Sequence, residues 1–337
     1  MLGLALLAAC GMAGLAAGAD TPPPTQARVI IVQRPGAIVA FAPQLEVVRP
    51  MIARGLTNLT GKPTLTAAWR SLVSTQDVVG LKVVSDPGPT GGTRPAVAAA
   101  VVEGLLAAGL PPQHVIVWDK HLGDLRQAGF VALHARYGVR VEGALEAGYD
   151  PTKFYDSSLL GQLVWGDSEF GKEGTGIGRK SYVSKLVSHE MTKLINLTPL
   201  LNHNLVGVNG NLYSLSMGSI DNTLRFVTSG ERLATAVPEV YALPILGDRV
   251  VLNIVDALLG QYYGEDRSLL HYTFELNQLR FSTDPVALDV LSIQELERER
   301  EAAQVPAVNV DLSLYQNANL LEIGVSDTRH IQVDWLR

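Results

Sequence analysis

The chain has 337 residues, of which 47% are apolar and 18% charged, so it can bury a large core in one big domain. Its 27 Lys and Arg residues and 33 Asp and Glu residues give a formal net charge of −6. That balance argues against a nucleic-acid-binding protein, which needs a basic face. The single cysteine is Cys10, so the chain lacks the ligands of a Cys-ligated iron–sulfur cluster or a thiolate metal site.

The first 19 residues are rich in Leu, Ala and Gly, and no charged side chain precedes Asp20. They fit a cleaved signal peptide, a lipoprotein leader acylated at Cys10, or a retained anchor close to the ~20 residues that span a bilayer. Each alternative places the rest of the chain on the extracytoplasmic (periplasmic) side of a bacterial membrane, either membrane-associated or secreted. Residues 20–27, which include three successive prolines, are predicted to be a linker.

Apolar runs that alternate between the periods of strands and helices fill the first half of the remaining chain. The predicted elements are strands at 28–33 and 37–41, a helix at 44–58 broken at Pro50, a strand at 77–84, a helix at 94–110, a strand at 114–119 and a helix at 122–138. Strands separated by helices predict a mostly parallel sheet flanked by helices, which is an α/β fold.

The pattern weakens between residues 150 and 190, where Gly, Asp and Lys are frequent. Beyond it, the predicted elements are a strand at 193–201, a strand followed by a loop at 249–260, a helix at 282–301 with Asp284 as its N-cap, and a last strand at 331–337. Residues 28–337 are therefore predicted to form a single large domain, with a subdivision near 150–190 as the alternative.

Residues 200–219 carry no charge but contain four Asn and three Gly residues among their apolar ones. This composition does not suit a simple core helix or strand, because Asn and Gly favour sharp turns and close backbone approach. We therefore expect a candidate ligand loop here, with Asn202, His203, Asn204, Asn209 and Tyr213 as its polar side chains.

Four ionisable residues lie within or just after predicted strands: Lys82, Asp119, His203 and Asp256. In parallel sheets the carboxyl ends of the strands gather at one edge, where ligands bind, so these residues form the catalytic set if the protein is an enzyme. Each has a structural alternative. Lys82 could extend its ammonium to the sheet edge, Asp119 could cap a helix, His203 could be a structural hydrogen-bonding group, and Asp256 could open a turn.

Two further motifs receive structural interpretations. The segment GTGIGR at 174–179 resembles a nucleotide-binding loop, but no clear strand precedes it and a strand-like pattern follows, so a flexible hairpin is favoured. Asp284 and Asp289 are five residues apart on the predicted helix, about 140° apart at ~100° per residue, so they do not form a carboxylate pair on one face.

Four segments, in this order, resemble the domain of unknown function 362 family over about residues 45–337. They are DVVGLKVV with the helix and strand that follow it, INLTPLLNHNLVGVNGNLYSLSMGSIDNTLRF, VVLNIVDALLGQYYG and STDPVALDV. The resemblance implies an α/β protein of a kind often exported in bacteria. Some relatives carry an added ferredoxin-type segment, for which this chain has no cysteines.

The resemblance also implies a changed ligand loop. Similar proteins typically read Lys-x-His-Asn-Leu-x-Gly-Val-Thr-Gly-x-Leu-Lys-Asn-Leu in this segment, and His203 fits that pattern. Asn202 occupies the first Lys position, Asn209 the Thr position, and Tyr213 and Ser214 the later Lys-Asn pair. Two cationic positions have become neutral, which would weaken the hold on an anionic ligand.

These observations lead to two expectations about function. The first is an exported, membrane-tethered binding or accessory subunit, with a degenerate site and a larger membrane protein complex as partner. The alternative is an extracytoplasmic enzyme acting on a small polar or anionic substrate, with or without a divalent metal bound by oxygen and nitrogen ligands. An enzyme requires a pocket with room for substrate, whereas an accessory subunit should have the pocket filled by Tyr213 and an apolar outer patch.

Overall fold

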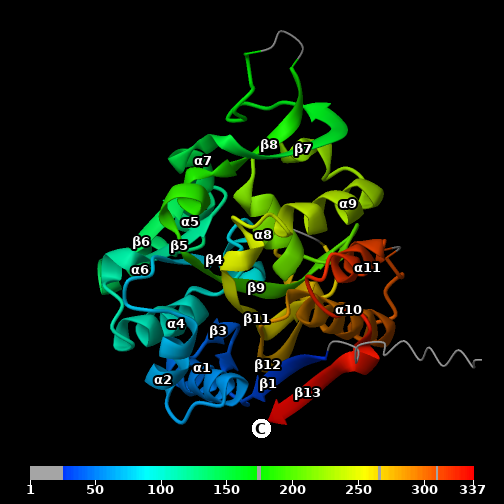
Figure 1. The fold of residues 1–337 in the computed structure, drawn as a ribbon. Helices are drawn as coiled ribbons and strands as arrows, with labels where there is room; N and C mark the ends of the chain where they lie inside the picture. Colours follow the sequence, from blue (N-terminus) through cyan, green and yellow to red (C-terminus); the bar gives the residue numbers. More distant parts are fainter. Residues whose placement is uncertain (1–25, 173–175, 265–266, 309) are drawn as a thin grey trace, which may run out of the picture.

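A central sheet with helices on both faces organises the chain in a computed structural model that describes residues 26–172, 176–264, 267–308 and 310–337 (Figure 1). Within these residues the sheet has nine strands, eight of which form a continuous path. In spatial order the path is β13 (Ile331–Leu336), β1 (Ala27–Gln33), β12 (Thr273–Ser282), β11 (Val250–Gln261), β9 (Lys193–His203), β4 (Val79–Lys82), β5 (Val115–Asp119) and β6 (Arg140–Gly143). The leader, Cys10 and most of the linker lie outside the described residues.

The predicted mostly parallel sheet is confirmed. Along the path, only β12 runs antiparallel to its neighbours β1 and β11, and the other adjacent pairs are parallel. The sequence pattern did not predict β12. The two-residue strand β10 (Gly207–Val208) folds back on the end of β9 as an antiparallel partner.

Helices cover the two faces of the sheet as separate layers. The helices on one face are α1 (Leu45–Thr60), α2 (Leu65–Leu72), α4 (Pro95–Ala107), α5 (Leu122–Gln127) and α6 (Val131–Tyr137). Those on the other are α8 (Asn211–Ser219), α9 (Gly230–Tyr241), α10 (Pro285–Ala302) and α11 (Ser313–Leu320). The short helices α3 (Gly88–Gly91) and α7 (Ala144–Ala147) follow β4 and β6 in the chain.

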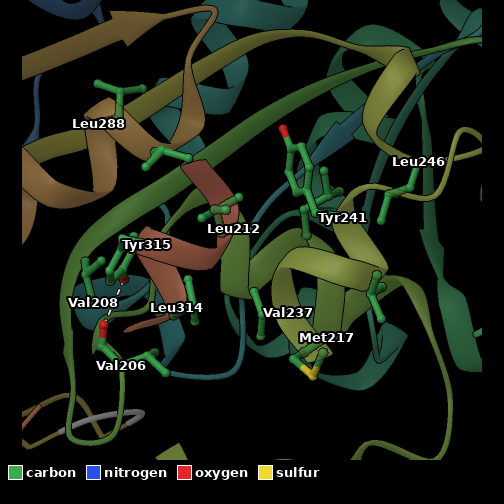
Figure 2. Close-up of a cluster of buried hydrophobic side chains, with 14 of the residues drawn as sticks. Val206, Val208, Leu212, Met217, Val237, Tyr241, Leu246, Leu288, Leu314 and Tyr315 are labelled. Carbon is green, nitrogen blue, oxygen red and sulfur yellow. Dashed lines mark hydrogen bonds between the residues drawn. The ribbon is translucent and has the colours of Figure 1, made fainter. Parts of the chain in front are cut away.

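Side chains alternate along each strand, so successive residues of an interior strand face opposite layers. In β4, Val79 and Leu81 join the core beneath α1 and α4, which turns Lys82 toward the opposite layer. Figure 2 shows the second core, where residues of α8, α9 and α11 meet the turn before β10, and the Tyr315 hydroxyl donates a hydrogen bond to the Val206 carbonyl over 2.8 Å. Lys82 therefore lies beneath a densely packed layer.

The predicted break of the first helix at Pro50 is wrong, because α1 continues through it. Pro50 is exposed, while Val48 and Met51 on either side of it are buried in the core. Packing of this buried face outweighs the loss of one hydrogen bond on the solvent side.

The helix predicted over 122–138 is two helices, α5 and α6. Gly129 between them has φ +91°, a left-handed conformation that glycine adopts without strain, and it ends α5. By contrast, the predicted start of α10 is confirmed, since the Asp284 side chain accepts a hydrogen bond from the Ala287 amide over 2.8 Å.

The stretch in which the sequence pattern weakens contains a hairpin of its own. β7 (Tyr149–Gln162) and β8 (Ile177–Ser184) pair antiparallel in a separate two-stranded sheet that projects at the top of Figure 1. Residues 174 and 175 of the GTGIGR segment lie outside the described residues, and residues 177–179 belong to β8. A strand at this point fits the hairpin interpretation better than a nucleotide-binding loop, which requires a following helix. Near the N-terminus, the strand expected at 37–41 is shortened to β2 (Ile38–Val39), which pairs with β3 (Ala42–Pro43).

Candidate functional site

Lys82 and Asp119 are the last residues of the adjacent parallel strands β4 and β5. The Lys82 ammonium lies 2.8 Å from Asp119 Oδ1, and the Lys82 side chain is only 2% exposed. The sequence placed Lys82 within a predicted strand and Asp119 at the end of another, and the structure brings them together because the carboxyl ends of parallel strands meet at one edge.

The remaining hydrogen-bonding capacity of Lys82 is used inside the protein. Its Nζ donates to the Val83 carbonyl over 2.7 Å and to the Ser214 hydroxyl over 3.0 Å. A Cβ on Gly218 of α8 would lie 2.4 Å from Lys82 Cε, so a glycine is needed where the helix crosses the lysine. The alternative that Lys82 extends to the solvent at the sheet edge is wrong.

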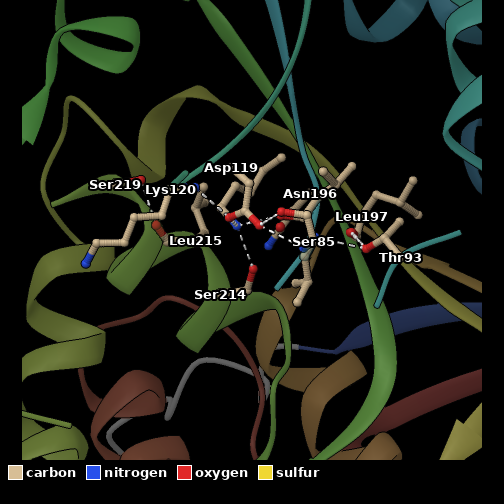
Figure 3. A network of polar contacts seen from close by, with 12 residues as sticks. Ser85, Thr93, Asp119, Lys120, Asn196, Leu197, Ser214, Leu215 and Ser219 are labelled. Carbon is tan, nitrogen blue, oxygen red and sulfur yellow. Dashed lines mark hydrogen bonds and ion pairs between the residues drawn. The ribbon is translucent and has the colours of Figure 1, made fainter. Parts of the chain in front are cut away.

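Asp119 is held by the loop after β4 as well as by Lys82. Its Oδ2 accepts the Ser85 amide over 2.8 Å and the Ser85 hydroxyl over 2.7 Å, and its Oδ1 accepts the Lys120 amide (Figure 3). Burial by itself raises the pKa of Asp119, but the Lys82 charge and these hydrogen bonds outweigh it and hold the pKa below its usual range. Asp119 is therefore not the helix cap that the sequence allowed, and α5 starts after His121.

A cavity of about 190 Å³ opens above this ion pair. Asp86 in its wall is exposed and Lys82 is buried, so the cavity runs from the surface to the pair. Its walls come from the loops after β4 and β5, from α8 and from the turn after it. The lining residues are Lys82, Val84, Asp86, Asp119, Lys120, His121, Asp124, Asn209, Tyr213, Ser214, Met217, Gly218, Thr223 and Val227.

Lys120 lines the cavity, although it is not one of the four residues in the predicted catalytic set. Its ammonium donates a hydrogen bond to the Thr223 hydroxyl over 2.8 Å, and in Figure 3 its side chain points away from the Asp119 network. Burial lowers the pKa of Lys120 to about 8, although the charges of Asp167, Asp221 and Asp119 act in the opposite direction. Its position directly after a strand end, between Asp119 and His121, was the signal that could have identified it.

The candidate ligand loop divides between two environments. Asn209 and Tyr213 line the cavity, whereas Asn202, His203 and Asn204 lie outside its lining. The Asn202 amide donates to Asn204 Oδ1 over 2.9 Å, and the His203 ring packs on Tyr213 with centroids 4.4 Å apart. His203 lies seven residues along β9 beyond Asn196, the residue opposite Lys82, which explains its separation from the ion pair.

The expected loss of charge at position 202 does not affect the cavity. Asn202 accepts a hydrogen bond from the buried guanidinium of Arg300 on α10, and it lies outside the cavity lining. Of the two positions at which similar proteins carry a Lys, only Tyr213 lines the cavity. Its side chain forms part of the wall and does not fill the cavity, whose volume is about 190 Å³. Lys82 and Lys120 remain as cations in the lining.

Asp256 does not end a strand as predicted, because β11 continues to Gln261. It is fully buried, and its Oδ2 lies 3.2 Å from Arg94 Nη1 and accepts the Arg94 amide over 3.0 Å. This pair lies outside the cavity lining. Of the four residues in the predicted catalytic set, the structure thus brings Lys82 and Asp119 together and places His203 and Asp256 elsewhere.

Residues 211–219 form α8, a helix whose residues other than Tyr213 are all buried, so the expectation that this segment is not a core helix is wrong. Asp289 of α10 satisfies the start of α8: it accepts the Asn211 amide over 2.7 Å, the Asn211 side chain over 2.9 Å and the Leu212 amide over 3.0 Å. Burial raises the pKa of Asp289 to about 7. Asp284 and Asp289 thus cap two different helices and do not act as a catalytic pair.

The described residues contain no group of three or more His, Cys, Asp or Glu side chains arranged to hold a metal ion. A ligand set for the expected divalent metal is therefore absent from the described residues. In the same ranges, every helix is too short or too polar to cross a membrane.

Comparison with known proteins identifies one family. The model of the family described as Domain of unknown function (DUF362) matches residues 79–294. No curated protein matches the chain. Among solved structures, the chain is similar to a Thermotoga maritima protein solved by the Northeast Structural Genomics Consortium, with 10% sequence identity and a TM-score of 0.40. That similarity covers 80% of this chain and 61% of the other, so this chain spans less than two thirds of that protein.

Proposed function

The chain belongs to the DUF362 family, and we propose that it is an exported enzyme whose cavity binds, as substrate, a small polar compound with one acidic group. The observation that carries the proposal is the cavity itself, which has the buried Lys82–Asp119 pair at its base and Lys120 in its wall. Converging polar groups in a cavity with free volume are typical of a small-molecule site.

The charges of the lining limit what this cavity accepts. Lys82 and Asp119 neutralise each other, and Lys120 supplies a cation whose structural partner is a hydroxyl. The carboxylates of Asp86 and Asp124 are part of the same wall. They disfavour a ligand with several negative charges, such as a polyphosphate. About 190 Å³ is the volume of roughly six water molecules at ~30 Å³ each, which also favours a small compound.

Acetate, glycolate and inorganic phosphate are the probes that test this proposal by calorimetry and thermal unfolding. We expect the monovalent carboxylates to bind and Lys120→Met to weaken them roughly 10- to 100-fold, since a hydrogen bond to a charged group contributes about 1.5–3 kcal/mol. Lys62→Met, an exposed lysine between α1 and α2, is the matched control and should leave binding unchanged. Equal loss in both variants, or no binding of any probe, would contradict the proposal.

A second function, a membrane-tethered accessory subunit, is supported by the β7–β8 hairpin. Trp165 in its connecting loop is 82% exposed, and Leu160 and Phe170 are 55% and 46% exposed. Exposed apolar side chains gathered on a projecting element are typical of a contact surface. We propose that the partner is a larger protein complex in the membrane to which the N-terminal leader would direct the chain.

Trp165→Ala tests this second function. We expect a change in the free energy of unfolding within about 0.5 kcal/mol, because the side chain is exposed, together with loss of stoichiometric co-elution from native membranes in mild detergent. Trp335→Ala is the matched control, since Trp335 is 48% exposed on β13 at the other end of the molecule. Co-elution that survives Trp165→Ala, or that Trp335→Ala abolishes equally, would argue against a docking role for the hairpin.

A further inference from the structure

Two lysines line the same cavity in different chemical environments. Lys82 is buried and ion-paired with Asp119. Lys120 is half-buried, and its amine nitrogen donates to the neutral hydroxyl of Thr223 over 2.8 Å. An amine bound to a carboxylate is held as a protonated cation, whereas an amine beside a hydroxyl can lose a proton without breaking an ion pair.

We propose that Lys120 forms an imine with the carbonyl group of a small oxo acid bound in the cavity. The inference rests on the proposed function, because the acidic group of the same compound is what the cavity would retain. It adds a covalent role for Lys120 and a chemical class for the substrate, a compound that carries both a carbonyl and a carboxylate. Amines that act in this way are activated by burial or by a nearby cation, and Lys120 has both.

The step is balanced without an oxidant or a reductant. The lone pair of the Lys120 nitrogen attacks the carbonyl carbon, and the carbon–oxygen π electrons move to the oxygen. A proton passes from the nitrogen to that oxygen and gives a carbinolamine. Protonation of the hydroxyl then releases water as the carbon–nitrogen double bond forms. Asp86, His121 and Asp124 also line the cavity, and side chains of these types can accept and return the proton.

The charged groups around Lys120 come from several elements. Asp119 precedes it on β5, Asp221 follows α8, Asp167 lies in the hairpin loop, and Lys82 comes from β4. The carboxylates favour the ammonium form, yet burial dominates and the pKa of Lys120 is about 8. At pH 8 about half of this amine is neutral, compared with about 0.4% of a lysine with the ordinary pKa of about 10.4.

The test uses the full-length chain with glyoxylate and sodium cyanoborohydride at pH 8, read by intact mass and peptide mapping. We expect one carboxymethyl adduct, at Lys120, formed at least about tenfold faster than at the exposed Lys62. Glycolate, which lacks the carbonyl, should slow this labelling by competition. Lys120→Arg keeps a cation in the cavity, so it should still bind glycolate while losing the adduct. The labelling rate in the parent chain should reach half its maximum near pH 8.

The outcomes separate the two proposals. Glycolate binding together with a Lys120 adduct no faster than that of Lys62 would overturn the imine and leave the anion-binding function standing. If neither glycolate nor glyoxylate binds, the proposed function fails and the imine fails with it. An adduct in Lys120→Arg at the parent rate would assign the reaction to another lysine and overturn the inference.

Discussion

Replacing Lys82 by methionine is expected to lower the free energy of unfolding by about 3–5 kcal/mol, because it leaves Asp119 as a buried charge without its partner. Lys82 and Asp119 lie 2.8 Å apart with side-chain exposures of 2% and 11%, so water would replace only a small part of the stabilisation that the ammonium gives to Asp119. Urea unfolding followed by circular dichroism measures the loss. The cavity would also lose its base, so the binding of small carboxylates should fall together with stability.

A double-mutant cycle separates the ion pair from general damage. Lys82→Met with Asp119→Asn removes both charges, and we expect it to recover more than about 1 kcal/mol of the loss caused by Lys82→Met alone. Gly218→Ala disturbs the same pair sterically, since its Cβ would lie 2.4 Å from Lys82 Cε, and it should destabilise by about 1–3 kcal/mol. Gly123→Ala in α5 meets open space and should be neutral or stabilising. Additive effects of Lys82→Met and Asp119→Asn would refute the coupling.

Replacing Asp289 by alanine is expected to lower the free energy of unfolding by about 3 kcal/mol, since buried donors that lose their acceptor cost about 1–3 kcal/mol each. Asp289 accepts from the Asn211 amide, the Asn211 side chain and the Leu212 amide, which together begin α8. Because α8 carries Tyr213 and Ser214 into the cavity, the variant should also weaken ligand binding. Urea unfolding and calorimetry with glycolate check the two effects.

The pH dependence of stability distinguishes Asp289 from other carboxylates. Burial raises its pKa to about 7 in the folded protein, above the value of 3.8 of an unperturbed Asp. Its contribution to stability is therefore fully present below about pH 4 and is lost as the pH rises through about 7. The side chain of Asp289→Asn cannot ionise. Between pH 5 and pH 8 the free energy of unfolding of the parent should therefore fall by about 2–3 kcal/mol relative to that of this variant, at about 1.36 kcal/mol per pH unit between the unfolded and folded pKa values. Parallel stability curves for the two proteins would contradict this assignment.

Part of the site could be predicted from local sequence. Lys82 lay near the end of one predicted strand and Asp119 at the end of another, and the α/β pattern placed the carboxyl ends of these strands at one edge. Asp284 was predicted to be an N-cap because it precedes Pro285 and a run of residues with helical periodicity. The pairing of Lys82 with Asp119, 37 residues apart, needed only the order of the strands in the sheet.

The rest depended on partners distant in the chain. Nothing near Lys120 in the sequence indicates Thr223, which lies 103 residues away. Asp256 interrupts an apolar run as a strand-end residue would, yet it lies within β11 because Arg94, 162 residues earlier, neutralises it there. A buried charge is stable only with a counter-charge or hydrogen bonds, and where these come from is decided by the packing of the layers.

The sequence by itself determined the family and the alternation of strands and helices, because composition and period are local properties of the chain. The tertiary structure alone decided that α8 is a core helix, since Asn211, which would disfavour burial, is satisfied by Asp289, 78 residues away. It also decided that Lys82 and Lys120 line the same cavity and that His203 lies outside its lining. Burial and pairing of polar groups are set by long-range contacts, and these determine which of the candidate residues can meet a ligand.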